Sequence, residues 1–178
     1  CGCNNFRLSS SIDDLISPIS PSGDNAGVQS AVDEYCKGGY SIKIPATGKY
    51  TTSFILKDID GDKISEAVAF YEPSNKIGTI SMAIIKKSGD KWSVVSNIEG
   101  TATDVNSVDF CDFNNDGKME IIVCWSVVSK LTGTSINVYS QNENNGAYSL
   151  QAVSKAITGS DFICVDVNDD GVKDLLVF

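Results

Sequence analysis

The chain has 178 residues, of which 42% are hydrophobic, and its 23 acidic and 14 basic residues give a net charge of −9. This length permits one domain with a sizeable core, and no apolar run is long enough to form a transmembrane helix. The negative charge argues against nucleic-acid binding, and the absence of histidine excludes Ser-His-Asp triads and histidine-containing zinc sites.

Residues 1–23 are predicted to be a tether, because they are rich in Ser, Asn and Asp and contain two prolines. A leading cysteine ahead of such a tether resembles a mature bacterial lipoprotein, in which the first cysteine carries a diacylglyceryl group. The resemblance implies lipidation of Cys1 and anchoring to the outer face of a bacterial cell membrane. The alternative is that Cys1 is an arbitrary start, since the lipobox that would precede it is not in the sequence.

Residues 24–39 are predicted to contain a short amphipathic helix that packs on the following domain. Asp24 or Asn25 is a plausible N-cap, and Gly38 and Gly39 provide a stop. The apolar positions follow the spacing i, i+3, i+4, i+7 and i+8, and they are Val28, Ala31, Val32, Tyr35 and Cys36.

Residues 40–178 read as strands and contain an internal repeat. The alternation of Tyr40, Ile42 and Ile44 predicts an edge strand that Pro45 terminates. Three segments then align without gaps at intervals of 54 residues, namely DIDGDKISEAVAFY from position 58, DFNNDGKMEIIVCW from position 112 and DVNDDGVKDLLVF from position 166. Each acidic stretch lies between two apolar runs, so each is expected to connect the two strands of a hairpin.

The remainder of each period adds two more strands. GTISMAIIKK matches GTSINVYSQ, and DKWSVVSNI matches GAYSLQAVS. Four short antiparallel strands at this period are typical of a β-propeller blade. We therefore predict an all-β fold of propeller-type blades, with two complete repeats and one partial repeat after the short helix. The alternative is a long antiparallel sheet or a sandwich.

A closed propeller needs about four to eight blades. We therefore expect these 178 residues to be part of a longer protein and the outer blade faces to be left apolar and exposed. Assembly with a second chain is the alternative.

The loops at 58–66, 112–120 and 166–174 place acidic or amide side chains at positions 1, 3 and 5. Such oxygen ligands suit Ca²⁺. An EF-hand would close with a Glu at position 12 inside a helix, but position 12 is here Ala69, Val123 or Val177. The acid lies instead at position 9 and leads into a β-type run, which predicts a metal loop between strands. The alternative is a set of solvated Asx-turns without metal, although crowded carboxylates repel each other without a cation.

This pattern, D-h-N-x-D-G-x-x-[DE]-h-h-h with h apolar, resembles the FG-GAP/VCBS repeat family, known from integrin alpha-subunit propellers and many bacterial surface proteins. The resemblance covers roughly residues 50–178. It implies β-propeller blades whose loops bind Ca²⁺ through the side chains at positions 1, 3, 5 and 9 and the carbonyl of position 7. The implied ligands are Asp58, Asp60, Asp62, Glu66 and the Ile64 carbonyl; Asp112, Asn114, Asp116, Glu120 and the Lys118 carbonyl; and Asp166, Asn168, Asp170, Asp174 and the Val172 carbonyl.

Two departures from the family pattern concern the first two loops. Position 6 of the first loop is Lys63 in place of Gly, which predicts a distorted or empty loop because this position needs a positive φ. Position 9 is Glu66 or Glu120 where the family more often has Asp, so the longer side chain either reaches the metal or leaves a gap for water. The third loop is expected to fit best.

Three of the six cysteines, Cys111, Cys124 and Cys164, lie inside apolar strand-like runs. We expect them to be small buried hydrophobic residues. A Cys111–Cys164 or Cys124–Cys164 disulfide is the alternative and would require neighbouring strands.

The leading functional hypothesis is a non-enzymatic, calcium-stabilised module at the bacterial cell surface that binds a protein or glycan ligand. One alternative is a propeller-type glycoside hydrolase or polysaccharide lyase that uses acids outside the loops, with Glu99, Asp104 and Asp109 as candidates. Another is a scaffold for an appended catalytic domain.

Overall fold

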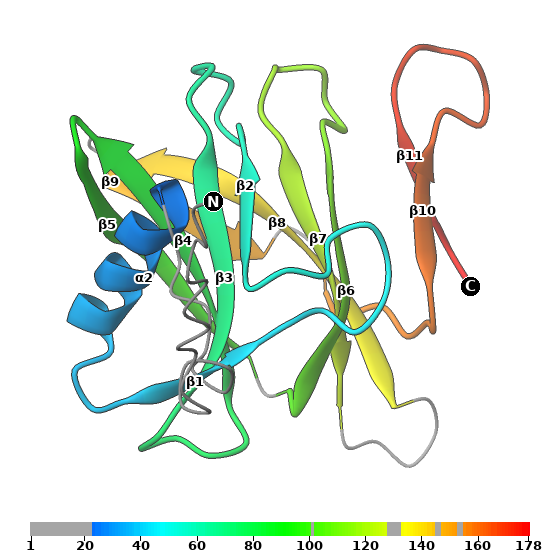
Figure 1. Ribbon diagram of the computed structural model, residues 1–178. Helices are drawn as coiled ribbons and strands as arrows, with labels where there is room; N and C mark the ends of the chain where they lie inside the picture. Colours follow the sequence, from blue (N-terminus) through cyan, green and yellow to red (C-terminus); the bar gives the residue numbers. More distant parts are fainter. Residues whose placement is uncertain (1–22, 101, 128–132, 145–146, 153–154) are drawn as a thin grey trace, which may run out of the picture.

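The computed structural model describes residues 23–100, 102–127, 133–144, 147–152 and 155–178, so Cys1 and nearly all of the predicted tether lie outside the described residues. Within this part of the chain, one helix precedes eleven strands (Figure 1). No helix among the described residues is long and apolar enough to cross a membrane. The elements are α2 (Asp24–Tyr35), β1 (Tyr40–Lys43), β2 (Phe54–Lys57), β3 (Glu66–Pro73), β4 (Ile80–Ser88), β5 (Lys91–Gly100), β6 (Asp104–Cys111), β7 (Glu120–Ser126), β8 (Thr134–Asn144), β9 (Ala147–Ala152), β10 (Phe162–Val165) and β11 (Asp174–Val177).

The first sheet, which we call blade 1, contains β1 to β5 and has a split first strand. Strands β1 and β2 pair antiparallel with the C-terminal and N-terminal halves of β3, and together they occupy one strand position beside β3, β4 and β5. The predicted edge strand before Pro45 is thus confirmed. Between β1 and β2 the chain crosses to the next sheet, where the Thr47 N–H donates to the Asn106 carbonyl at 2.8 Å.

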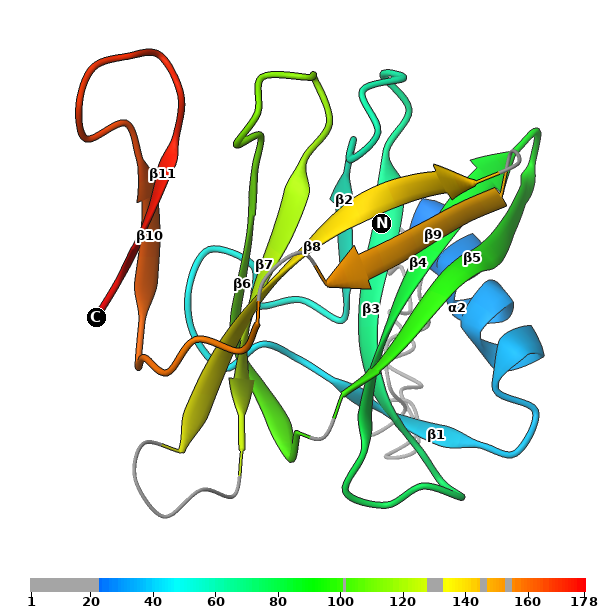
Figure 2. The ribbon, with the colours of Figure 1, turned by 180° about the vertical axis from the view of Figure 1, so that it is seen from behind.

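The second sheet, blade 2, has four antiparallel strands in the order β6-β7-β8-β9, and the third unit is the β10–β11 hairpin (Figure 2). Strands β3, β7 and β11 begin at Glu66, Glu120 and Asp174, the acids at position 9 of the three loops. The predicted arrangement of two complete units and one partial unit is therefore confirmed.

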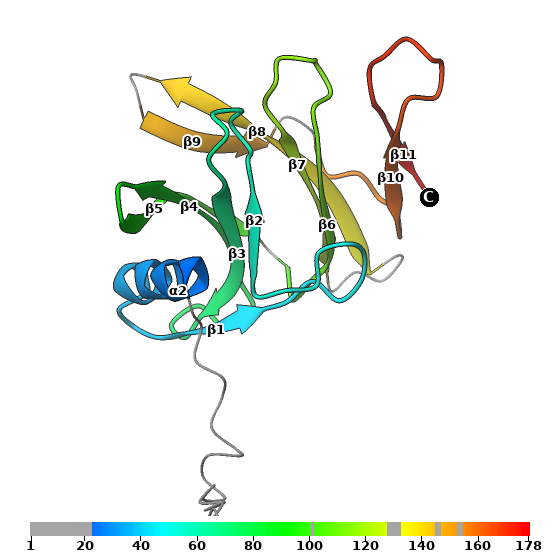
Figure 3. The ribbon, with the colours of Figure 1, turned by 45° about the horizontal axis from the view of Figure 1, so that its top comes forward.

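The units stack face to face (Figure 3). Alternate side chains of a strand point to opposite faces of its sheet, so a strand in the middle of the stack contributes to two cores. On β7, Ile121 and Val123 enter the core between blade 1 and blade 2, whereas Ile122 and Cys124 enter the core between blade 2 and the β10–β11 hairpin. This explains why β7 reads as a continuous apolar run: both of its faces are buried.

Helix α2 covers the remaining face of blade 1, as predicted (Figure 3). Its buried residues Val28, Ala31 and Val32 pack against the blade 1 residues Ala67, Ala69, Tyr71, Ala83, Ile85 and Trp92. Two predicted details are wrong. Gly23 precedes the helix at φ 61° without a side-chain cap, and Tyr35 is 51% exposed, because Cys36 after it fills the next place on this apolar cluster.

The expected exposure of apolar blade faces is therefore wrong for blade 1, where α2 supplies the cover, and confirmed for the third unit. On the β10–β11 hairpin, one face packs on blade 2, and the other leaves Ile163, Val165 and Leu176 exposed together with the following Phe178. The described residues form an open stack.

The cysteines behave mainly as small apolar residues. Cys111 and Cys124 are buried, Cys164 is partly buried, and all three are free thiols, so neither alternative disulfide is present. Burial raises the pKa of Cys164 to about 12.

Candidate metal-binding loops

The three acidic loops lie at the same end of the stack, at the top of the molecule in Figure 1. We call residues 58–66 loop 1, residues 112–120 loop 2 and residues 166–174 loop 3. Each connects the first and second strand positions of its unit, namely β2–β3, β6–β7 and β10–β11. Since successive units share one topology, the repeat brings three equivalent loops side by side.

All three loops have the same backbone hydrogen-bond frame around position 1. The Oδ2 atom of the position 1 Asp accepts a hydrogen bond from the N–H of position 6. The N···O distances are 3.0 Å for Lys63 to Asp58, 2.9 Å for Gly117 to Asp112 and 2.8 Å for Gly171 to Asp166. This bond curls the first half of each loop around the carboxylate.

Positions 5 and 9 complete the same frame. The Oδ1 atom of the position 5 Asp accepts a bond from the N–H of position 7, and one oxygen of the position 9 acid accepts a bond from the N–H of position 2. The donors and acceptors at position 5 are Ile64 to Asp62 at 2.7 Å, Lys118 to Asp116 at 2.8 Å and Val172 to Asp170 at 2.8 Å. Those at position 9 are Ile59 to Glu66 at 2.9 Å, Phe113 to Glu120 at 3.0 Å and Val167 to Asp174 at 3.1 Å.

The position 9 acid therefore closes the loop whether it is Glu or Asp. Glu66 is 1% exposed and Glu120 is 7% exposed. Burial raises the pKa of both carboxyls, while the backbone N–H bonds from Ile59 and Phe113 act in the opposite direction. The longer side chain of Glu thus reaches into the loop from the first residue of the following strand.

Lys63 does not distort loop 1. It adopts the left-handed φ of 71° that Gly117 and Gly171 adopt at 84°, and it keeps the hydrogen bond to Asp58. Such a conformation costs a residue with a Cβ atom about 1–2 kcal/mol. The expectation of a distorted loop is therefore wrong, because the frame outweighs the local strain.

Loop 1 has its glycine at position 4, where it contacts loop 2. Gly61 has φ 79°, and a Cβ atom at this position would lie 2.6 Å from the carbonyl oxygen of Gly117. The backbone N–H of Met119, at position 8 of loop 2, donates to the Ile59 carbonyl of loop 1 at 2.7 Å. Asn115 of loop 2 in turn donates to the carbonyl of Gly171 in loop 3 at 3.4 Å. Each loop is therefore in contact with the next.

The acids converge most closely in loop 1. Ligand oxygens of Asp58, Asp60 and Glu66 lie within 4.8 Å of one another, and they form the one group of three or more potential metal-ligating side chains found among the described residues. Loop 3, which the sequence predicts to be the best fit, has Asn168 at position 3, and this amide donates to Asp170 at 2.9 Å.

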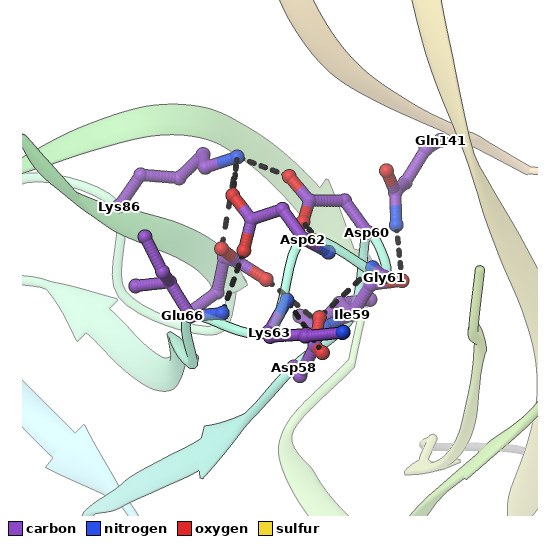
Figure 4. Close-up of polar contacts among 10 residues, drawn as sticks. Asp58, Ile59, Asp60, Gly61, Asp62, Lys63, Glu66, Lys86 and Gln141 are labelled. Atoms are coloured by element: carbon purple, nitrogen blue, oxygen red, sulfur yellow. Dashed lines mark hydrogen bonds and ion pairs between the residues drawn. The ribbon is translucent and has the colours of Figure 1, made fainter. Parts of the chain in front are cut away.

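Loop 1 also contains a cation that sequence reasoning missed. The Nζ atom of Lys86, on β4, contacts Asp60 and lies 3.6 Å from Glu66 Oε1 and 3.8 Å from Asp62 Oδ2 (Figure 4). Burial disfavours the ammonium, but the hydrogen bond and charge of Asp60, with Glu66 and Asp62, outweigh it and raise the pKa of Lys86. The sequence could have indicated this cation through a comparison of the third strands of the two repeats, because only the first repeat has a lysine at this position.

The corresponding position in blade 2 is uncharged. Ile85 pairs with Ala67 in blade 1, and Tyr139 pairs with Ile121 in blade 2, so Lys86 corresponds to Ser140. Loops 2 and 3 offer acid and amide oxygens, the donor set that hard cations prefer. The residues of these two loops fit Ca²⁺, whereas loop 1 already contains an ammonium group.

The acids considered for catalysis are dispersed. Glu99 on β5 forms an exposed ion pair with Lys76 at 2.5 Å. Asp104 and Asp109, on β6, each accept a hydrogen bond from the N–H of the next residue, at 2.9 Å and 2.8 Å. Within the described residues, these acids are not brought together.

The comparisons with known proteins agree with this repeat architecture. No curated protein and no solved structure matches the chain. A family model described as the FG-GAP-like repeat matches residues 58–123, which run from the start of loop 1 through blade 1 and loop 2 into β7. This part of the chain therefore contains an FG-GAP-like repeat.

Proposed function

We propose that the chain is a non-enzymatic β-propeller-like module at the surface of a bacterial cell, with Ca²⁺ bound by loops 2 and 3. The observation that carries the calcium proposal is the common frame of these loops, which holds three acids and one amide side chain around each turn. Asp112, Asn114, Asp116 and Glu120 would hold one ion, with the Lys118 carbonyl. Asp166, Asn168, Asp170 and Asp174 would hold the other, with the Val172 carbonyl.

Bound calcium would stabilise the pairing of the two strands that each loop connects. Its charge would neutralise the carboxylates in the loop that connects the two strands of each hairpin and would hold the start of β7 or β11 against the strand before it. With dissociation constants of about 10⁻⁴ to 10⁻³ M, which are typical of extracellular modules, and millimolar calcium, each ion would add about 1 kcal/mol to the free energy of unfolding.

Thermal unfolding of the full chain in calcium and in excess chelator tests this proposal. Two sites together are worth roughly 2 kcal/mol, so we expect the chelator to lower Tm by about 4–8 °C. The matched control is the Asp112→Asn, Asp166→Asn double variant, in which Tm should be nearly independent of calcium. A wild-type Tm that is the same in both conditions would contradict calcium binding by these loops.

The surface location and the ligand are separate parts of the proposal. A diacylglyceryl group on Cys1 would anchor the module, and the tether would hold it away from the membrane. Mass spectrometry of the N-terminal peptide from isolated membranes tests this, and an unmodified Cys1 would contradict it. The bound partner would be a protein or a glycan. A glycan array and a pull-down with the intact protein that both find no ligand would count against a binding role.

A further inference from the structure

The side chain of Lys86 reaches three of the four acids of loop 1 that the family resemblance gives as metal ligands. Ile85 pairs with Ala67, the residue that follows Glu66, so Lys86 lies on β4 opposite Glu66, at the start of β3 next to loop 1. Figure 4 shows its ammonium group directed at Asp60, Asp62 and Glu66. The lysine therefore comes from outside the repeat motif.

Lys86 faces the carboxylate oxygens of loop 1 that are not used by the backbone hydrogen bonds of the loop. In Asp62 and Glu66, one oxygen accepts a backbone N–H and the other faces Lys86. In Asp60, Oδ1 accepts the Asp62 N–H at 3.3 Å, and Oδ2 contacts the ammonium. A lysine ammonium has three N–H donors and no acceptor, so its chemistry matches three leftover oxygens.

One buried oxygen of Glu66 faces Lys86. Glu66 is 1% exposed, and its Oε1 atom has no hydrogen-bond partner. Lys86, at 3.6 Å, is the cation closest to that oxygen among the ion pairs of the described residues. A buried carboxylate without a compensating charge is strongly unfavourable, so the ammonium provides the neutralisation that a metal would otherwise provide.

We propose that Lys86 is a built-in substitute for calcium in loop 1, which makes this loop independent of metal, unlike loops 2 and 3. For loops 2 and 3 the inference rests on the proposed function. Calcium entering loop 1 would have to displace the ammonium from all three oxygens or bind beside a like charge. Millimolar calcium would therefore leave loop 1 without an ion. Removing the charge of Lys86 converts loop 1, with its four carboxylates, into a third calcium site.

Calcium titration of the full chain by calorimetry, together with equilibrium dialysis, tests the substitution. We expect two bound ions in the wild type, three in Lys86→Met, and two in the control Lys76→Met, which removes an exposed lysine paired with Glu99 away from the loops. Three ions in the wild type, or no gain in Lys86→Met over the wild type, would overturn the inference. No ion in the wild type but one in Lys86→Met would support it while contradicting the proposed function of loops 2 and 3.

A second variant keeps the test decisive if Lys86→Met does not fold. In the Asp112→Asn, Asp166→Asn double variant, which retains Lys86 and an intact loop 1, we expect calcium binding to be lost. One ion that remains bound to this variant would show that loop 1 takes calcium in the presence of Lys86, and would overturn the inference.

Discussion

Loop 1 and loop 2 have the same spacing of acids and the same backbone frame, but their charges are balanced differently. In loop 1 the Lys86 ammonium from β4 lies among the carboxylates, whereas Ser140 occupies the corresponding place in blade 2. The glycine has also moved, from position 6 in loop 2 to position 4 in loop 1. Two copies of one motif can therefore share a fold and differ in charge balance, because the difference lies on a neighbouring strand.

The largest difference between the loops should come from their glycines. Gly61→Ala would place a Cβ atom 2.6 Å from the Gly117 carbonyl and would also force alanine to a φ of 79°. Gly117→Ala meets only the strain of its φ of 84°, since nothing lies within 4 Å. We expect a loss of about 3 kcal/mol or more for Gly61→Ala and about 0.5–1 kcal/mol for Gly117→Ala, in which the smaller entropy of the unfolded chain offsets part of the strain. Urea unfolding in excess chelator measures both, and equal losses would contradict the contact between the loops.

The next effect concerns the cation of loop 1. In the absence of calcium, Lys86→Met leaves the buried Glu66 carboxylate uncompensated, and we expect it to lower the free energy of unfolding by about 1–3 kcal/mol. The control Lys76→Met breaks an exposed pair and should cost less than about 1 kcal/mol. Calcium should restore much of the stability of Lys86→Met and none of that of Lys76→Met beyond the wild-type response. Equal losses in chelator would mean that Lys86 is only a surface charge.

The smallest effect should come from position 6. Lys63→Gly relieves a left-handed backbone conformation and should stabilise the protein by about 0.5–1 kcal/mol, because the relieved strain exceeds the added entropy of the unfolded chain. The reciprocal change Gly117→Lys in loop 2 should destabilise by a similar amount. Melting temperatures measured in chelator, where metal binding does not contribute, check the pair. A destabilised Lys63→Gly would show that the lysine side chain makes a compensating contact.

Much of the fold follows from the sequence because the relevant interactions are local or periodic. The interval of 54 residues, the four strand positions of each complete unit and the position 9 acid at the start of β3, β7 and β11 are all readable from residue order. Helix α2 is readable from the spacing of Val28, Ala31 and Val32, although its cap at Gly23 is not. Gly23 has no side chain that could accept a hydrogen bond from the first turn, so the usual sequence signal of an N-cap is missing.

The acidic loops by themselves are also determined locally, since each closes through hydrogen bonds between residues no more than seven positions apart. Only the tertiary structure shows that α2 covers the outer face of blade 1, that Gly61 lies against Gly117, and that Lys86 points into loop 1. These contacts depend on strand register and on the stacking of blades, which place residues distant in sequence within a few ångströms of each other. The charge balance of a loop is therefore a property of its neighbours as well as of its own motif.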